Sequence, residues 1–310
     1  MTELRRILVA GSERFVGEAL LRRLGRERCM GLGDAAPDLR DAAAVDAFFA
    51  RERPDAVFLI GGHSGGIARN QREPASLMLD NLRIQDAVIP AAHRYGVAKL
   101  VFVAAACIYP RACEQPMHPS LLGTGRVEPT SEAYAMAKSA GLALCRAFAD
   151  EHGARFVTAI PANPFGPGDD TRSEDAHVVG ALLRRMHEAK LRGDAEVAVW
   201  GSGRARRDFL YVDDLADALI FVLDRYDDAT TPINVSAGSD VTIAEIAERI
   251  QKVVGFEGRL VFDTSRPDGA PRKTLDGSVL AALGWRPRVS LDDALAETHR
   301  WMLAAETARG

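Results

Sequence analysis

The sequence lacks several features that mark specialised classes of protein. It has four cysteines in 310 residues, with neither a Cys-x-x-Cys pair nor a metal-ligand spacing, which argues against a disulfide framework or a zinc site. The apolar run near its start is far too short for a signal peptide or a membrane span. Its net charge of −4 gives no footprint for nucleic acid. We therefore expect a cytoplasmic globular protein that binds no metal, membrane or nucleic acid.

Short β-branched runs alternate with helix-period segments through the first half of the chain. Runs of this kind occupy residues 6–10, 55–60, 99–104 and 155–160. Repetition of strand, helix and strand predicts an α/β protein with a Rossmann-type, doubly wound parallel sheet.

The pattern changes after Pro161, where a turn-rich segment leads into shorter strands, helices and a final helix over 291–305. We place the domain boundary there. Residues 1–165 form the Rossmann domain, to which parts of 205–235 return. Residues 166–310 form a smaller, mixed α/β domain that binds the substrate.

A glycine-rich segment, residues 11–17, follows the first strand and opens a helix. At this position backbone N–H groups cradle the pyrophosphate of a dinucleotide. Gly11 and Gly17 stand at the two ends, and Arg14 stands between them, where its side chain would either obstruct the cofactor or clasp its phosphate. We predict a dinucleotide site, the alternative being a plain strand-to-helix turn.

Asp34 lies just beyond the second strand, where an acidic residue bonds the ribose hydroxyls of NAD. No arginine stands close by to meet the 2′-phosphate of NADP, and Glu13 adds a second negative charge. We therefore expect NAD in preference to NADP. The alternative is that Asp34 only caps a turn.

Tyr134 and Lys138 are four residues apart, so a helix puts them on one face. The lysine charge favours the phenolate and is expected to lower the pKa of Tyr134 toward working pH. The pair could then transfer a proton beside a hydride.

Several motifs occur together in one order along the chain. They are Cys107-Ile-Tyr-Pro, Gln115-Pro-Met, Glu128-Pro-Thr, Tyr134-Ala-Met-Ala-Lys138, the segment 161–169, His177, Trp200-Gly-Ser-Gly, Arg207-Asp-Phe-Leu-Tyr-Val-Asp-Asp and the segment 266–273. This set resembles the extended short-chain dehydrogenase/reductase family, and within it the enzymes that epimerise and reduce GDP-linked 4-keto-6-deoxy sugars.

The resemblance implies a role for each matched catalytic residue. Tyr134 would be the acid of the hydride step and Lys138 its support, which also contacts the cofactor. Cys107 and His177 would be an epimerisation pair that removes and returns a proton beside the 4-keto group. Thiol and imidazole suit that task because both can titrate near neutral pH without a metal.

The resemblance also implies a binding site for a nucleotide-diphosphate sugar. It further implies a homodimer, because relatives of this type commonly form one. The matched substrate-binding positions are Asn163, Arg185, Trp200, Arg207 and Lys273. Guanidinium groups among them would match phosphate oxygens.

Three departures from the family pattern all affect reduction. Ala105 replaces a catalytic serine, Arg14 replaces the middle glycine, and the 2′-phosphate arginine is missing near Asp34. We predict an epimerase acting at C3 or C5 of an NDP-4-keto sugar, with weak or altered reductase activity. The alternatives are a redox-neutral C4 epimerase with tightly bound NAD, and a sugar-nucleotide-binding paralogue without catalysis.

Overall fold

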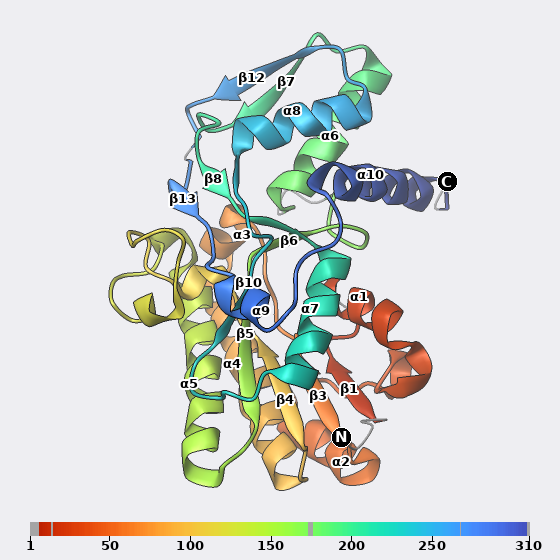
Figure 1. The fold of residues 1–310 in the computed structure, drawn as a ribbon. Coiled ribbons are helices and arrows are strands. Elements are labelled where there is room, and N and C mark those ends of the chain that lie inside the picture. Colours follow the sequence, from red (N-terminus) through yellow and green to blue (C-terminus); the bar gives the residue numbers. More distant parts are fainter. Residues whose placement is uncertain (1–5, 14, 173–175, 267, 309–310) are drawn as a thin grey trace.

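A six-stranded sheet forms the lower half of the molecule in Figure 1. The computed structural model describes residues 6–13, 15–172, 176–266 and 268–308. The strand order is β10-β5-β4-β3-β1-β2, and every pairing is parallel. The strands are β1 (Ile7–Ala10), β2 (Cys29–Met30), β3 (Ala56–Leu59), β4 (Lys99–Val103), β5 (Phe156–Pro161) and β10 (Ile233–Val235). The α/β, Rossmann-type prediction is confirmed.

Helices cover both faces of this sheet, as parallel strands require. On one face α1 (Phe15–Leu24) packs against α7 (Val212–Arg225). On the other face α4 (Pro74–Arg94) lies between α2 (Ala42–Glu52) and α5 (Glu132–His152).

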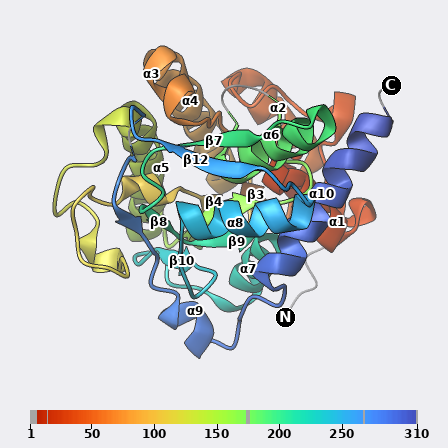
Figure 2. The ribbon, with the colours of Figure 1, turned by 90° about the horizontal axis from the view of Figure 1, so that it is seen from above.

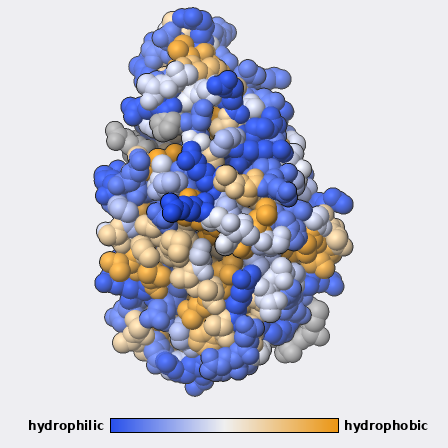
Figure 3. Space-filling model, turned by 90° about the vertical axis from the view of Figure 1, so that its left-hand side faces the viewer, coloured by the Kyte–Doolittle hydropathy of each residue, from blue (hydrophilic) through white to orange (hydrophobic). Residues whose placement is uncertain are grey.

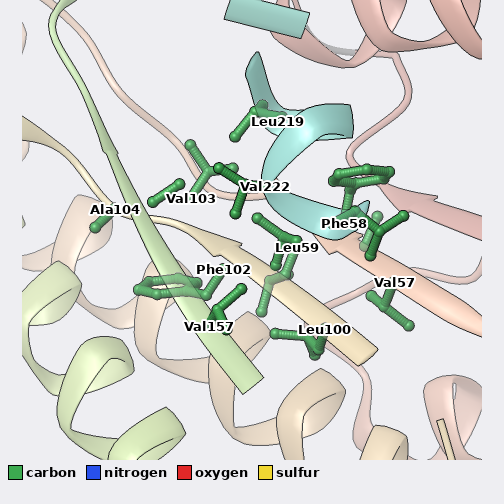
Figure 4. Close-up of a cluster of buried hydrophobic side chains, with 14 of the residues drawn as sticks. Val57, Phe58, Leu59, Leu100, Phe102, Val103, Ala104, Val157, Leu219 and Val222 are labelled. Carbon is green, nitrogen blue, oxygen red and sulfur yellow. The ribbon is translucent and has the colours of Figure 1, made fainter. Parts of the chain in front are cut away.

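The strands are uniformly apolar because both of their faces are buried. Figure 4 shows Phe58 of β3 on the side of the sheet that carries Leu219 and Val222 of α7, whereas the ring of Phe102 of β4 lies on the opposite face, which α5 covers. All four side chains are fully buried. Burial of a large apolar side chain stabilises the fold by about 1.5–3 kcal/mol, so this core fixes the ends of the strands.

A second apolar core lies above the sheet (Figures 1 and 2). It is enclosed by three helices, α6 (Val178–Arg192), α8 (Ile243–Val254) and α10 (Leu291–Thr307), and by the parallel pair β7 (Glu196–Trp200) and β12 (Arg259–Asp263). Helix α10 matches the final helix predicted from the sequence. Among the helices of the described residues, none is long and apolar enough to cross a membrane.

Short strands join the two cores. One sheet consists of β11 (Val241–Thr242), β8 (Arg206–Arg207) and β13 (Arg272–Lys273), and β6 (Asn163–Phe165) pairs with β9 (Phe209–Tyr211). The remaining short helices are α3 (Ile67–Arg72) and α9 (Ser278–Ala282), with single 3-10 turns at 26–28, 33–35, 106–108, 119–121 and 129–131.

Candidate active site

The glycine turn after β1 is packed too tightly for larger residues. Gly11 has φ +101°, and a Cβ there would lie 2.8 Å from the backbone of Gly61. A Cβ on Gly17 would lie 2.1 Å from the Gly11 carbonyl oxygen. Glycine at both positions lets α1 begin directly beside the end of β1, which leaves backbone N–H groups facing an open edge. Arg14 lies outside the described residues.

A cavity of about 330 Å³ opens beside this turn. Its lining comes from the ends of β1 and β3 and from the segment after β2. The lining residues include Gly11, Ser12, Glu13, Gly31, Gly33, Asp38, Leu39, Arg40, Gly61, Gly62 and His63. A tight glycine turn opening on a cavity at the carboxyl ends of parallel strands fits a dinucleotide.

Asp34 is not among the residues that line this cavity, although its neighbour Gly33 is, and its contact with the ribose stays a prediction. It lies in the turn Gly33–Ala35, and its side chain is exposed to solvent. Arg40 does line the cavity, and both its Nε and its Nη2 donate to the Asp38 carboxylate at 3.0 Å. The preference for NAD rested on Asp34, on Glu13 and on the lack of a nearby arginine, and Arg40 in the lining removes the third of these arguments.

Tyr134 and Lys138 share one face of α5, at the edge where β4 ends. Lys138 is buried, and its Nζ donates to the Val103 carbonyl at 3.1 Å. The same Nζ lies 5.9 Å from the centre of the Tyr134 ring. A Cβ on Gly62 would lie 3.6 Å from it. The lysine therefore lies between the tyrosine and the cavity beside the glycine turn, which Gly62 lines.

Burial decides the charge of both groups. It lowers the pKa of Lys138 to about 8, with the Cys107 thiol opposing the shift. It also raises the pKa of Tyr134 well above its usual value, and the charge of Cys107 acts in the same direction. The expected lowering of the Tyr134 pKa is therefore wrong for the free protein, because burial disfavours the charged phenolate. A neutral tyrosine suits the role of proton donor.

Cys107 lies in the 3-10 turn that follows β4 (Ala106–Ile108), and this turn packs against α5. Burial raises the pKa of its thiol to about 11, while the charges of Lys273 and Lys138 oppose the shift. Burial in turn lowers the pKa of Lys273, and the Cys107 thiol opposes that shift. The thiol and the two ammonium groups thus form one electrostatically coupled cluster.

The position of Lys273 depends on a contact between distant segments. Met117 donates from its backbone N to the Thr274 carbonyl at 2.7 Å, and the Thr274 backbone N donates to the Gln115 side-chain oxygen at 2.9 Å. Asn234 of β10 binds the Met117 carbonyl at 2.8 Å. These bonds hold β13, and with it Lys273, against the turn that carries Cys107.

His177 is the N-cap residue of α6, and its side chain is exposed to solvent. The surrounding chain nevertheless lowers the pKa of its imidazole by desolvation, with nearby Asp170 opposing the shift. Among the described residues, no hydrogen bond joins His177 to Cys107 or Tyr134. The imidazole and the thiol come from different elements, and their role as an epimerisation pair stays a prediction.

The predicted substrate residues lie above the sheet edge. Asn163 donates to the Asp208 carbonyl at 2.8 Å. Arg207 donates to its neighbour's carbonyl at 2.8 Å and to the Asp268 carbonyl at 3.3 Å. Burial lowers its pKa, while the charges of Asp268 and Glu128 oppose the shift.

Arg185 and Trp200 form a separate contact in this upper part of the molecule. The guanidinium carbon of Arg185 lies 5.3 Å from the centre of the Trp200 indole. Arg185 comes from α6, whereas Trp200 ends β7.

Glu128 is a site residue to which the sequence analysis gave no role. It is buried, accepts from the Thr130 hydroxyl at 3.3 Å, and lies 3.2 Å from the Arg111 guanidinium. Its charge opposes the lowered pKa of both Arg207 and Lys273. Glu128 therefore balances the cations of the site. Its place in a matched Glu-Pro-Thr motif was the signal available in the sequence.

The described residues offer no set of ligands for a metal ion. Within the ranges that the structure describes, His, Cys, Asp and Glu form no group of three that could hold a metal ion. All four cysteines are free thiols.

The glycine turn, the cavity beside it and the Tyr134–Lys138 pair define a dinucleotide-dependent enzyme of the short-chain dehydrogenase/reductase class. Residues 7–238 match the model of the NAD dependent epimerase/dehydratase family, and the chain belongs to this family. The family and the enzyme class predicted from the sequence are thus confirmed.

Relatives and solved structures of similar sequence cover nearly the whole chain. GDP-L-fucose synthase 1 of Arabidopsis thaliana is 46% identical over 301 residues, which are 96% of this chain and 93% of that protein. A GDP-6-OMe-4-keto-L-xylo-heptose reductase from C. jejuni superposes with a TM-score of 0.92 at 29% identity, covering 98% and 99% of the two chains. A GDP-L-fucose synthetase from Naegleria fowleri bound to NADP gives 0.89 at 29% identity, covering 100% and 98%.

The raised pKa of Cys107 predicts a slow, strongly pH-dependent alkylation of this thiol in the free protein. Only the thiolate reacts, so iodoacetamide should modify Cys107 at least about tenfold more slowly than free cysteine at pH 7.5. The rate of alkylation should rise with pH and should level off only above the thiol pKa of about 11. Mass spectrometry can follow Cys107 separately from Cys113, because trypsin cleaves after Arg111.

Lys273→Met should slow this alkylation further at a given pH, because it removes the charge that lowers the thiol pKa. Arg272→Met is the matched control, since Arg272 lies on the same strand but donates to Asp240 instead. An equal effect of the two variants would show that Lys273 does not act on the thiol.

Proposed function

We propose that the protein is a GDP-sugar epimerase of GDP-L-fucose synthase type, which exchanges protons at C3 or C5 of a 4-keto sugar and reduces the 4-keto group weakly. The observation that carries this proposal is the grouping of Cys107 with Tyr134, Lys138 and Lys273 at one edge of the sheet. The relatives named above are a GDP-L-fucose synthase and a reductase of a GDP-linked sugar, which supports the GDP-linked substrate.

The sugar would lie between the Cys107 thiol and the His177 imidazole. One group removes a proton from the carbon beside the 4-keto group, and the other returns a proton to the opposite face. Negative charge develops on the ketone oxygen during this exchange. Tyr134 is held neutral by burial, so its hydroxyl can donate a hydrogen bond to that oxygen.

The charges of Lys138 and Lys273 would assist the proton exchange at Cys107. Both lower the pKa of the Cys107 thiol, which increases the fraction of thiolate available as a base. The charge of Lys138 also favours the form of Tyr134 that has given up its proton. Substrate binding would strengthen both effects by excluding water from the cluster.

The segment that follows β12 extends from the Trp200 region to Cys107. Asp268 binds Ser202, and its carbonyl accepts from Arg207. A few residues later β13 brings Lys273 to Cys107. A nucleotide-diphosphate sugar lying along this segment would place its base at Trp200, its phosphates at the arginines and its sugar at the thiol.

The glycine turn and the adjoining cavity would hold a nicotinamide dinucleotide, whose bound form exchanges a hydride with C4 of the sugar. For the cofactor we propose NADP(H). Arg40 in the cavity lining supplies a cation for the 2′-phosphate. The solved Naegleria relative, which is bound to NADP, supports this choice.

A homodimer remains a prediction, for which we propose the α4 and α5 face. Leu79 on α4 and Met136 on α5 are 50% and 49% exposed. Figure 3 shows apolar residues gathered over the lower half of the side that carries α5, whereas the upper part is mostly hydrophilic. Localisation in the cytoplasm also remains a prediction.

Deuterium incorporation tests the epimerisation. In D₂O the enzyme should place deuterium at C3 or C5 of a GDP-4-keto-6-deoxy sugar. Cys107→Ala and His177→Ala should each reduce the exchange by about 10²-fold or more, the usual contribution of a positioned acid or base. Cys113→Ala is the control and should exchange normally. Unchanged exchange in both variants would refute the pair. Inversion at C4 of a GDP-sugar that carries a hydroxyl at C4, without deuterium uptake, would favour the redox-neutral epimerase.

Ala105→Ser tests the weak reduction. Ala105 precedes the turn that carries Cys107, at the end of β4. A hydroxyl there would add a second donor to the substrate oxygen, and loss of one such donor costs about 10²–10³ in rate. The variant should raise 4-keto reduction by tenfold or more, measured by NADPH oxidation, and should change deuterium exchange much less. No gain at saturating substrate would contradict this account of the missing serine.

Cofactor titration tests the role of Arg40. The wild-type protein should bind NADPH more tightly than NADH in calorimetry. Arg40→Ala should weaken NADPH by about tenfold through loss of a charge-assisted bond and leave NADH nearly unchanged. Asp34→Ala is the control and should alter neither affinity, because Asp34 lies outside the cavity lining. Tighter binding of NADH by the wild type would overturn the proposal.

A further inference from the structure

Two guanidinium groups occupy the surface of Trp200. The indole ends β7 and is 51% exposed. The guanidinium carbon of Arg185 lies 5.3 Å from the ring centre, and that of Arg266 lies 5.0 Å from it. Both distances fall within the range of a cation–π contact. A purine base that stacked on this indole would need space that the two cations now take.

The two cations are anchored very differently. Arg185 donates to the Ala198 carbonyl at 3.0 Å and to the Ala181 carbonyl at 3.2 Å, and burial lowers its pKa. Arg266 has a 57% exposed side chain, and its ion pair with Asp263 spans 4.0 Å. In the part of the chain that the structure describes, its guanidinium has this ion pair and the contact with the indole, but no hydrogen bond. Of the two groups, Arg266 is the one that can leave the indole.

The backbone around Arg266 is fixed on both sides. Asp263 pairs with Trp200 in the β7–β12 ladder, and its carbonyl accepts from the Gly201 backbone N at 2.9 Å. Asp268, on the other side, accepts from the Ser202 backbone N at 2.7 Å and from its hydroxyl at 2.8 Å. A rotation of the Arg266 side chain is therefore enough to move its guanidinium while these flanking bonds stay in place.

The same loop leads toward the proposed diphosphate site. The Asp268 carbonyl accepts from Arg207 at 3.3 Å, and a Cβ on Gly269 would lie 3.4 Å from the Arg207 guanidinium. Arg266 thus lies on the segment between the indole and Arg207. A long, flexible arginine at this point has the indole on one side and a second anion-binding arginine on the other.

We propose that Arg266 is a displaceable cation, which covers Trp200 in the free protein and turns to the diphosphate when a nucleotide base stacks on the indole. The inference rests on the proposed nucleotide-diphosphate sugar substrate. Base stacking on an aromatic side chain is stronger than an exposed cation–π contact, so the base can take the place of the guanidinium. The displaced cation then gains phosphate oxygens as partners.

The exchange makes Arg266 a determinant of specificity. A nucleoside displaces the cation and offers it no phosphate, so Arg266 opposes nucleoside binding. A nucleoside diphosphate displaces the cation and then binds it, so Arg266 favours the diphosphate. Substitution of Arg266 should therefore change the two affinities in opposite directions, which a fixed phosphate ligand or a merely structural residue would not do.

Titration of Arg266→Ala with guanosine and with GDP tests this proposal. Guanosine should bind about two- to fivefold more tightly than to the wild type, because the competing cation–π contact is gone. GDP should bind about tenfold more weakly. Calorimetry and tryptophan fluorescence can follow both titrations, and Trp200→Phe assigns the fluorescence change to this indole. Arg266→Lys, which keeps the charge, should lie between the two proteins for GDP.

Arg204→Ala is the matched control. Arg204 is an exposed arginine two residues from Ser202, and its guanidinium contacts the Ser202 hydroxyl rather than the indole. This variant should keep both affinities within about twofold of the wild type.

Two outcomes would overturn the inference while leaving the proposed function intact. They are a parallel loss of guanosine and GDP affinity in Arg266→Ala, and no change in either. Failure of the wild-type protein to bind GDP, with UDP and ADP bound in its place and the opposite shifts preserved, would retain the displaceable cation and refute the GDP-linked substrate. Failure to bind any of the three nucleoside diphosphates would overturn both proposals.

Discussion

The buried ammonium of Lys138 is the constraint on which the site depends. Its hydrogen bond to the Val103 carbonyl joins α5 to the end of β4. An ammonium group in such a position is costly to desolvate, so it is tolerated only where the helix and the sheet approach closely. Gly141 permits that approach, since a Cβ there would lie 2.5 Å from the Phe102 ring. The same packing sets the position of Tyr134, which lies one turn earlier on α5.

The chemistry of the site follows from the competition between burial and charge. Burial keeps Tyr134 and Cys107 protonated and lowers the pKa of Lys138 to about 8. Neighbouring cations oppose burial at the thiol, and the carboxylate of Glu128 opposes it at Lys273. The free protein therefore holds its acids in the protonated state. Substrate and cofactor bring the charges and the exclusion of water that would shift this balance toward proton transfer.

Long-range contacts decide how the upper part of the molecule meets the sheet. The segment at Met117 is tied to Thr274 and to Asn234 through backbone and side-chain hydrogen bonds, and these ties set Lys273 beside Cys107. The loop after β12 continues this line to Arg207 and Trp200. A substrate that spans the line would contact both cores, so its orientation is governed by the rigid packing between them.

The sequence by itself determined the parallel sheet, the positions of four of its six strands and the face shared by Tyr134 and Lys138, because apolar runs and helical spacing are local properties. It also determined the family, through motifs such as Cys107-Ile-Tyr-Pro. Only the tertiary structure decided that Asp34 lies outside the lining of the cavity beside the glycine turn, that Arg40 lines this cavity, and that burial raises the pKa of Tyr134. Desolvation and cavity lining depend on segments distant in the chain, and no spacing of residues encodes them.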